Sequence, residues 1–258
     1  MYFGTLMSIF YGLILGLFIK CEFNYKKLLL FILLFIASLG IVLSGAMSSM
    51  VSVLVLYLFI FISNIIFLCK KKKNSFISLI CLMISIISFS LVYISYNTFD
   101  NHLQKDLFEF KDETKSVSKG KVDDNFGTGR IYIWRKTIEK IKDAPITGYG
   151  IDNFRLAFNS KLLDSHNLIV DKAHNDYLQK MLCEGIISGV IFILFLLIIF
   201  FKLINKNLSP IYYGLYLAFI SYSVQAFFNI SVTRVAPIYF IIIGLLIGKI
   251  NDKKNIKK

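Results

Sequence analysis

The stretch Ile186 to Phe201, IISGVIFILFLLIIFF, decides the fold class, because it is long and apolar enough to cross a membrane as a helix. A helix needs roughly 20 apolar residues to cross about 30 Å of hydrocarbon. Six further stretches have the same character: Phe3 to Ile19, Leu28 to Leu43, Val51 to Cys69, Phe76 to Ile94, Ile211 to Ile230 and Val235 to Ile247. No strand alternation suggests a barrel. The sequence therefore predicts an all-α polytopic membrane protein with about seven transmembrane helices.

The composition also points away from a water-soluble protein. Hydrophobic residues make up 56% of the 258 residues and charged residues only 17%, whereas an ordinary soluble domain is about 25% charged. One long polar loop separates the fourth and fifth predicted spans. We therefore expect three parts: four transmembrane helices in 1–94, a mainly helical loop with the catalytic motif in 95–184, and three transmembrane helices with a basic tail in 185–258.

Lysines indicate on which side of the membrane each connection lies. If the spans alternate, the lysine-bearing connections and the C-terminal tail share one side, and they carry 14 lysines against only Glu22 and Asp252. The positive-inside rule assigns that side to the cytoplasm. The long loop, with 14 basic and 14 acidic residues, then lies outside. We expect a multi-pass protein of the cell inner (plasma) membrane, with an extracytoplasmic loop and a cytoplasmic C-terminus.

The basic character of the chain is thus a topology signal, which excludes nucleic acid as a partner. Seven spans and a cytoplasmic tail also place the N-terminus outside, although the first apolar run has neither the basic start nor the cleavage site of a signal peptide. We therefore expect that spans upstream of this sequence are missing.

An amphipathic helix is expected in the second half of the loop. Its apolar residues recur at helical spacing, with charges on the opposite face. They are Ile131, Trp134, Ile138 and Ile141. Pro145, Gly148 and Gly150 end this helix with a turn, and a short helix follows at Ile151 to Phe158. These two glycines are expected to serve the turn and not to cradle a phosphate, since they open no strand-to-helix loop.

A second helix is expected at the end of the loop. Asp171 is a suitable N-cap for it, and the helix would then run through His174 and Met181 and continue into the fifth span.

The most specific pattern of the chain lies in these two segments. The first contains, in order, Gly129, Arg130, Trp134, Pro145, Gly148, Gly150 and Phe154. The second is AHNDYL at 173–178, in which His174 and Asn175 are followed, after nine residues, by Gly185. In order and spacing, together with the layout of the spans, they resemble the O-antigen ligase and polymerase superfamily.

This resemblance implies a glycosyltransferase C-like fold and a role in cell-surface polysaccharide biosynthesis. Such enzymes transfer a glycan from undecaprenyl diphosphate to an acceptor hydroxyl, which belongs to lipid A core for a ligase and to another lipid-linked repeat for a polymerase. Both alternatives stay open. The implied partners are the undecaprenyl-diphosphate-linked glycan, the acceptor glycolipid or polysaccharide and membrane lipids, and no cofactor is implied.

The chemistry of such a transfer suggests roles for individual residues. His174 suits the removal of the acceptor proton, because an unperturbed histidine has a pKa of about 6.5 and a helix start near Asp171 would favour its neutral form. A guanidinium grips phosphate oxygens with two donors. The candidates for diphosphate and glycan binding are Arg130 first, then Arg135, Arg155, Arg234, Asn175 and Trp134. No acidic cluster calls for a metal, so we expect a metal-independent, inverting displacement.

Other interpretations compete with this one. Arg130 can instead pair with Asp123 or Asp124, and Trp134 can be an interfacial or core anchor. Members of the superfamily often carry an arginine in a Ser-Arg motif before the loop, where this chain has Met47. The loss of that cation favours an inactive remnant. An alternative of another class is a polysaccharide transporter or flippase, which the absence of mid-span charges and of an evident inverted repeat disfavours.

Overall fold

The computed structural model describes residues 2–22, 24–69, 75–99, 130–158, 172–230 and 233–252, and every regular element in these ranges is a helix. Five helices are long and apolar enough to cross a membrane. They are α1 (Tyr2–Lys20), α2 (Tyr25–Leu43), α3 (Met47–Cys69), α4 (Ser75–Phe99) and α9 (Ile186–Ile204). Within the described ranges, the chain is thus an all-α polytopic membrane protein, as the sequence predicts.

Two more apolar helices follow at the end of the chain. α10 (Pro210–Ala226) and α11 (Ala236–Asn251) have 17 and 16 residues and are shorter than the other five. The count of seven spans therefore stays a prediction. So does the division into 1–94, 95–184 and 185–258.

The chain forms two compact units. The first consists of Met1–Asp100, Ile199–Gln225 and Val232–Lys258, and the second of Asn101–Ile198 and Ala226–Ser231. Helix α9 therefore begins in the second unit and ends in the first.

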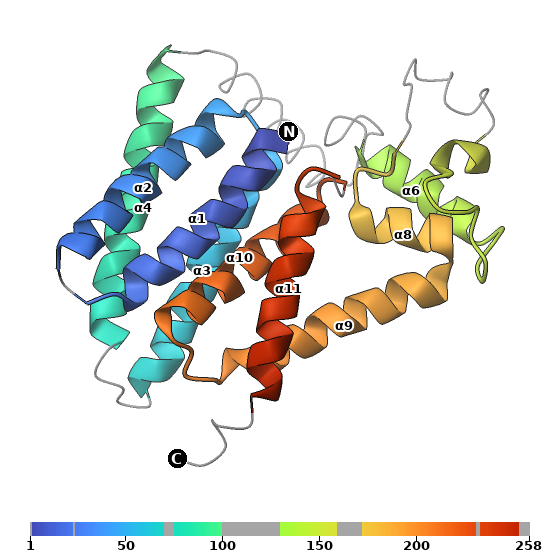
Figure 1. Cartoon of the computed structure of the whole chain (residues 1–258). Coiled ribbons are helices and arrows are strands. Elements are labelled where there is room, and N and C mark those ends of the chain that lie inside the picture. Colours follow the sequence, from blue (N-terminus) through green and yellow to red (C-terminus); the bar gives the residue numbers. More distant parts are fainter. Residues whose placement is uncertain are drawn as a thin grey trace. The chain divides into compact units, whose positions relative to one another are not determined.

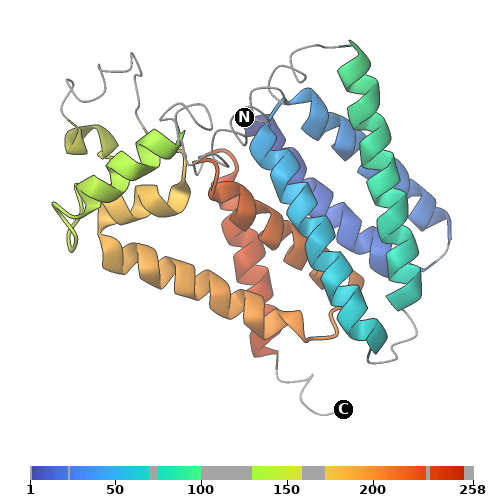
Figure 2. The ribbon, with the colours of Figure 1, turned by 180° about the vertical axis from the view of Figure 1, so that it is seen from behind.

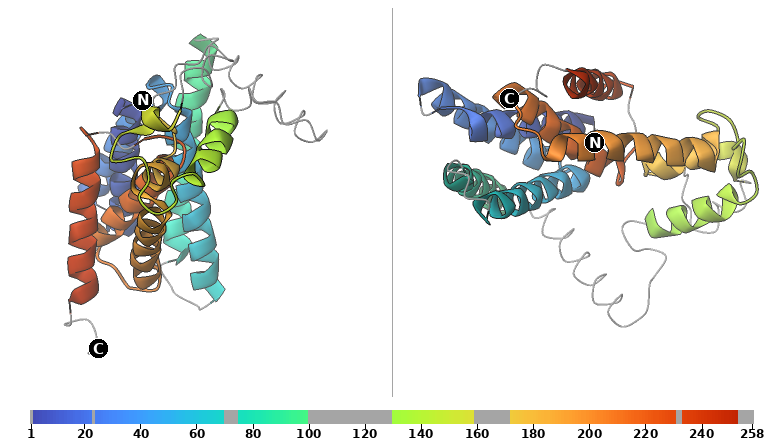
Figure 3. Two further views of the ribbon diagram at one scale, coloured as in Figure 1. Left: turned by 90° about the vertical axis from the view of Figure 1, so that its right-hand side faces the viewer. Right: turned by 90° about the horizontal axis from the view of Figure 1, so that it is seen from below.

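Four helices build most of the first unit. α1 packs against α2, α3 and α4, and α3 packs against α4. These helices are drawn in blue to green in Figures 1 and 2, and both views of Figure 3 show α3 beside α4. α10 also approaches α1 closely, since a Cβ atom added to Gly16 would lie 2.5 Å from the Cα of Gly214. Such small residues let membrane helices pack at short range.

Buried hydrogen bonds between side chains link α1, α3 and α10. Gln225 donates from Nε2 to Thr5 Oγ1 over 2.8 Å and to Ser49 Oγ over 3.1 Å. Ser221 donates to the backbone oxygen of Ser8 over 3.0 Å. Because water is scarce inside a membrane protein, these bonds satisfy groups that would otherwise stay unpaired.

The second unit carries the predicted loop helices. They are α6 (Arg130–Ile141), the 3-10 helix η1 (Phe154–Ala157) and α8 (Asp176–Glu184), and α8 contacts both α6 and η1. Their apolar side chains form one core that consists of Ile133, Ile141, Phe154, Ala157, Phe158, Ala173, Leu182 and Cys183.

The predicted amphipathic helix is confirmed as α6, but part of its predicted buried face is wrong. Ile138 is 48% exposed, whereas Ile133, Thr137 and Ile141, at intervals of four residues, are buried. Thr137 can be buried because its hydroxyl donates to the carbonyl oxygen of Ile133 over 2.7 Å. The spacing of apolar residues alone does not predict this buried face, because one of its residues, Thr137, is polar.

Candidate functional site

Helix α8 begins later than predicted. Its N-cap is Asn175, whose side chain accepts a hydrogen bond from the backbone N–H of Leu178 over 3.0 Å. Asn175 is only 2% exposed, so its amide serves the helix end and not the surface. The prediction that Asp171 caps a helix containing His174 is therefore wrong. Asp171 itself lies outside the described residues.

His174 stands just before this helix in a left-handed backbone conformation, with φ of 49°. A helix requires negative φ, so residue 174 cannot be part of one. The conformation turns the chain sharply at the residue that the sequence singles out, and a non-glycine residue there must be held in place by its surroundings. The side chain of His174 is half-buried, and its Nδ1 atom is fully buried.

Ala173 is fixed at both of its backbone groups. Its N–H donates to Gln179 Oε1 over 2.8 Å, and its carbonyl oxygen accepts from Trp134 Nε1 over 3.0 Å. Lys172 forms an ion pair with Asp152. Since Asn175 is also held as the N-cap, the residues on both sides of His174 have defined partners.

Trp134 therefore behaves as an anchor. Its ring packs edge-on against Phe227, with 5.4 Å between the ring centroids, while its N–H holds Ala173. This agrees with the alternative interpretation of Trp134 as a core anchor.

The other end of α8 is closed by the turn that follows α6. The backbone N–H of Tyr149 donates to Leu182 O over 3.0 Å, and that of Gly150 donates to Cys183 O over 2.8 Å. These bonds satisfy carbonyls that the end of a helix leaves without partners. Gly148 comes so close that an added Cβ would lie 2.5 Å from the carbonyl carbon of Cys183.

The prediction that Gly148 and Gly150 are turn glycines is confirmed by their φ values of 64° and 98°. Their N–H groups donate to the carbonyl oxygens of Ala144 and Cys183. These donors are therefore engaged within the protein and are not directed at a phosphate.

Gly185 separates α8 from α9, so the prediction of one helix continuing into the fifth span is wrong. Its φ is 91°, and an added Cβ would collide with the carbonyl oxygen of Ile146. The backbone N–H of Ile186 donates to Pro145 O over 2.8 Å across the same junction. The turn from Pro145 to Gly150 and Gly185, which follows the His-Asn pair after nine intervening residues, are thus two sides of one contact.

The predicted arginines lie in three places. Arg130 and Arg135 are on α6, Arg155 is exposed on η1, and Arg234 is exposed in the first unit. Arg130 is four residues before Trp134, so both side chains lie on the helix face that meets Ala173, whereas Arg135 is turned away from it.

Arg130 is half-buried at the start of α6, and this burial lowers the pKa of its guanidinium. An arginine nevertheless stays charged at neutral pH. Among the described residues no carboxylate forms an ion pair with it. The alternative partners Asp123 and Asp124 lie outside the described residues.

Sequence reasoning missed Gln179 and the Lys172–Asp152 pair. Gln179 reaches back past the start of its own helix to Ala173, and the ion pair joins residues 20 positions apart. No periodicity marks either contact. In the part of the chain that the structure describes, no three His, Cys, Asp or Glu side chains group into a metal site.

The fold and this site define a polytopic membrane protein whose candidate site lies in a helical segment between the spans α4 and α9. The family model of O-antigen ligase matches residues 32–193, which is more than half of the chain and includes both motifs of the site. The chain belongs to the O-antigen ligase family. A comparison with curated proteins finds no match.

Proposed function

We propose that this protein transfers a glycan from undecaprenyl diphosphate to an acceptor hydroxyl during the synthesis of cell-surface polysaccharide, with His174 as the general base. The main observation in support of this proposal is the backbone conformation of His174. Residue 174 adopts φ of 49°. Ala173 before it is hydrogen-bonded at both backbone groups, and Asn175 after it caps α8. Family membership supports the reaction class.

In this mechanism the acceptor oxygen attacks C1 of the donor sugar while His174 takes the proton of that hydroxyl. The bond from C1 to the diphosphate oxygen breaks, and the diphosphate leaves with the electron pair. Attack opposite the leaving group inverts C1. Because Nδ1 of His174 is buried, Nε2 is the atom that accepts the proton.

Arg130 is the first candidate for the group that stabilises the departing diphosphate. Arg130 lies on the same face of α6 as Trp134, whose indole N–H donates to Ala173 O. It is half-buried, and partial burial strengthens the attraction of its charge for an anion. Arg135, Arg155 and Arg234 are further candidates. Asn175 supports the site through the helix cap, and no metal takes part.

The acceptor defines two versions of this function, a ligase acting on lipid A core and a polymerase acting on another lipid-linked repeat. In both, residues 95–184 lie on the outer side of the inner membrane, seven helices cross it, and the basic tail is cytoplasmic.

The test uses His174→Ala in the host, with His166→Ala as the matched control because it removes the other histidine of the same loop half. At equal protein levels in the membrane, His174→Ala should abolish polymeric or ligated glycan and His166→Ala should preserve it. Unchanged glycan in His174→Ala would remove the catalytic role. Arg130→Gln should reduce the product more than Arg135→Gln does.

A further inference from the structure

Gln179 connects the helix that follows His174 to the residue that precedes it. Its Oε1 atom accepts from the backbone N–H of Ala173 over 2.8 Å, and its Nε2 atom donates to Cys183 Sγ over 3.7 Å. Ala173 is 0% exposed and Cys183 is 3% exposed, so water does not readily replace either contact. The side chain therefore joins the last turn of α8 to the residue just before His174.

The orientation of the Gln179 amide follows from its two partners. A backbone N–H can only donate, so the amide atom that faces Ala173 is the oxygen, and the NH₂ group then faces Cys183. Burial raises the pKa of the Cys183 thiol, which therefore stays protonated at neutral pH, and its sulfur accepts the amide hydrogen. An apolar side chain at residue 183 would remove the contact that fixes this orientation.

Cys183 is itself held by the turn that follows α6. Its carbonyl oxygen accepts from the backbone N–H of Gly150 over 2.8 Å, and a Cβ added to Gly148 would lie 2.5 Å from its carbonyl carbon. The turn thus fixes Cys183, Cys183 orients Gln179, and Gln179 holds Ala173. Contacts at the C-terminal end of α8 therefore help to fix the chain before its N-terminal end.

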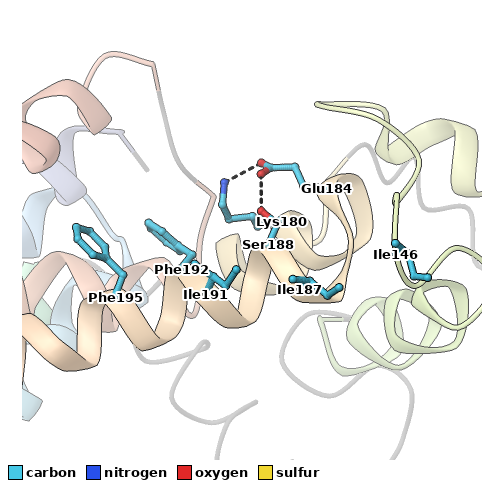
Figure 4. A pocket seen from close by; sticks show the side chains of 8 residues that line it. All are labelled: Ile146, Lys180, Glu184, Ile187, Ser188, Ile191, Phe192 and Phe195. Atoms are coloured by element: carbon cyan, nitrogen blue, oxygen red, sulfur yellow. Dashed lines mark hydrogen bonds and ion pairs between the residues drawn. The ribbon is translucent and has the colours of Figure 1, made fainter.

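The neighbouring pair on α8 provides a contrast. Lys180 and Glu184 have the same spacing of four residues, and Lys180 Nζ lies 2.8 Å from Glu184 Oε1. Both side chains are partly exposed and line a groove (Figure 4). This pair stays on the helix itself, whereas Gln179 reaches beyond the helix to Ala173.

We propose that Gln179, oriented by the Cys183 thiol, is a positioning residue for His174 in the transfer reaction. Gln179 fixes the N–H of Ala173, whose carbonyl oxygen is held by Trp134, and so sets the direction in which the chain enters the left-handed conformation at His174. A general base acts only within hydrogen-bond reach of the proton that it removes. This inference rests on the proposed function and adds two residues that need not touch the substrate.

The first test compares Gln179→Met with Lys180→Met, the same substitution one residue further along α8. Transfer of the host's lipid-linked glycan is measured with the purified full chain in nanodiscs, and thermal unfolding shows that each variant is folded. Gln179→Met leaves the N–H of Ala173 without its acceptor and should lower kcat about tenfold with KM unchanged, whereas Lys180→Met should keep kcat. Equal kcat values in the two variants would overturn the proposal.

The second test uses Gln179→Glu, which keeps an oxygen for Ala173 and should recover most of the kcat that Gln179→Met loses. Its carboxylate favours the protonated imidazole of His174, so the acid limb of the kcat profile should move to higher pH. Lys180→Met changes the net charge by the same unit and should leave this limb in place. The other charged groups around this segment are the same in every variant, namely Arg130, Asp152, Lys172 and Asp176.

A merely structural role of Gln179 would lower the unfolding temperature without moving the acid limb. An unmoved limb in Gln179→Glu would therefore overturn the proposal. So would a kcat of Gln179→Glu that stays as low as that of Gln179→Met at high pH.

The third test removes the thiol. Cys183→Ala should lower kcat about two- to tenfold, and it should lower kcat no further in Gln179→Met, because both changes break the same connection. Cys81→Ala is the matched control and should keep kcat, since Cys81 is also a free cysteine, is 1% exposed and lies on α4 in the first unit. Independent effects of Cys183→Ala and Gln179→Met would overturn the orienting role of the thiol.

His174→Ala separates this inference from the proposed function. Retained transfer in His174→Ala would refute the proposed base. Loss of transfer in His174→Ala together with full kcat in Gln179→Met would refute only the positioning role.

Discussion

Trp134→Phe tests whether the indole N–H positions His174. The substitution keeps an aromatic ring against Phe227 and removes the donor to Ala173, a residue that is 0% exposed. A buried carbonyl left without its donor costs about 1–3 kcal/mol. If the loss destabilises residues 172–175 in the transition state, kcat should drop by about five- to 160-fold, since each 1.36 kcal/mol is a factor of ten.

The assay is glycan transfer by the purified protein in nanodiscs, with kcat and KM determined separately. KM should change little, because the indole N–H that the variant removes is already donated to Ala173 O and not to a substrate. Thr137→Val is the matched control: it removes another buried hydrogen bond of α6, from the Thr137 hydroxyl to Ile133 O, without any link to Ala173. It should leave kcat unchanged. Normal kcat in Trp134→Phe, or an equal fall in Thr137→Val, would refute the reasoning.

Three further substitutions test the fold, two of them beside the site and one in the first unit. Gly185→Ala should destabilise the protein by more than about 2 kcal/mol, because it combines positive φ with a collision at Ile146 O, whereas Gly244→Ala, with open space around it, should be neutral in thermal unfolding. Asn175→Ala should cost about 0.5–2 kcal/mol through loss of the cap, and Asn175→Asp should recover most of it; equal unfolding temperatures for the two would contradict the capping role. Gln225→Leu should cost about 1–2 kcal/mol by removing bonds between helices, measured as a lower unfolding temperature in nanodiscs, and no change would mean that these bonds add nothing.

The sequence alone predicts the membrane class and the location of the candidate site, because both predictions depend on sequence patterns and not on contacts between distant residues. Apolar length reveals the spans, and the order and spacing of the motifs reveal the family. The turn at Pro145 was also predictable, since proline and two glycines within six residues leave few alternatives.

The details around His174 were not predictable, because they depend on competition between local and long-range contacts. Asp171 and Asn175 are both good cap residues, and helical spacing allows either. Long-range bonds to Ala173, from Trp134 and from Gln179, favour the start at residue 176 and leave His174 outside the helix. The break at Gly185 likewise exists because the turn from a distant part of the chain occupies the space beside it.

The most direct test of the general base is chemical rescue of His174→Ala in purified form. Transfer should fall by about 10²–10⁴, the usual contribution of a positioned base, and added imidazole should restore part of it. The restored rate should rise with pH as imidazole loses its proton. Wild-type rates in His174→Ala without imidazole would contradict the assignment of proton removal to this residue.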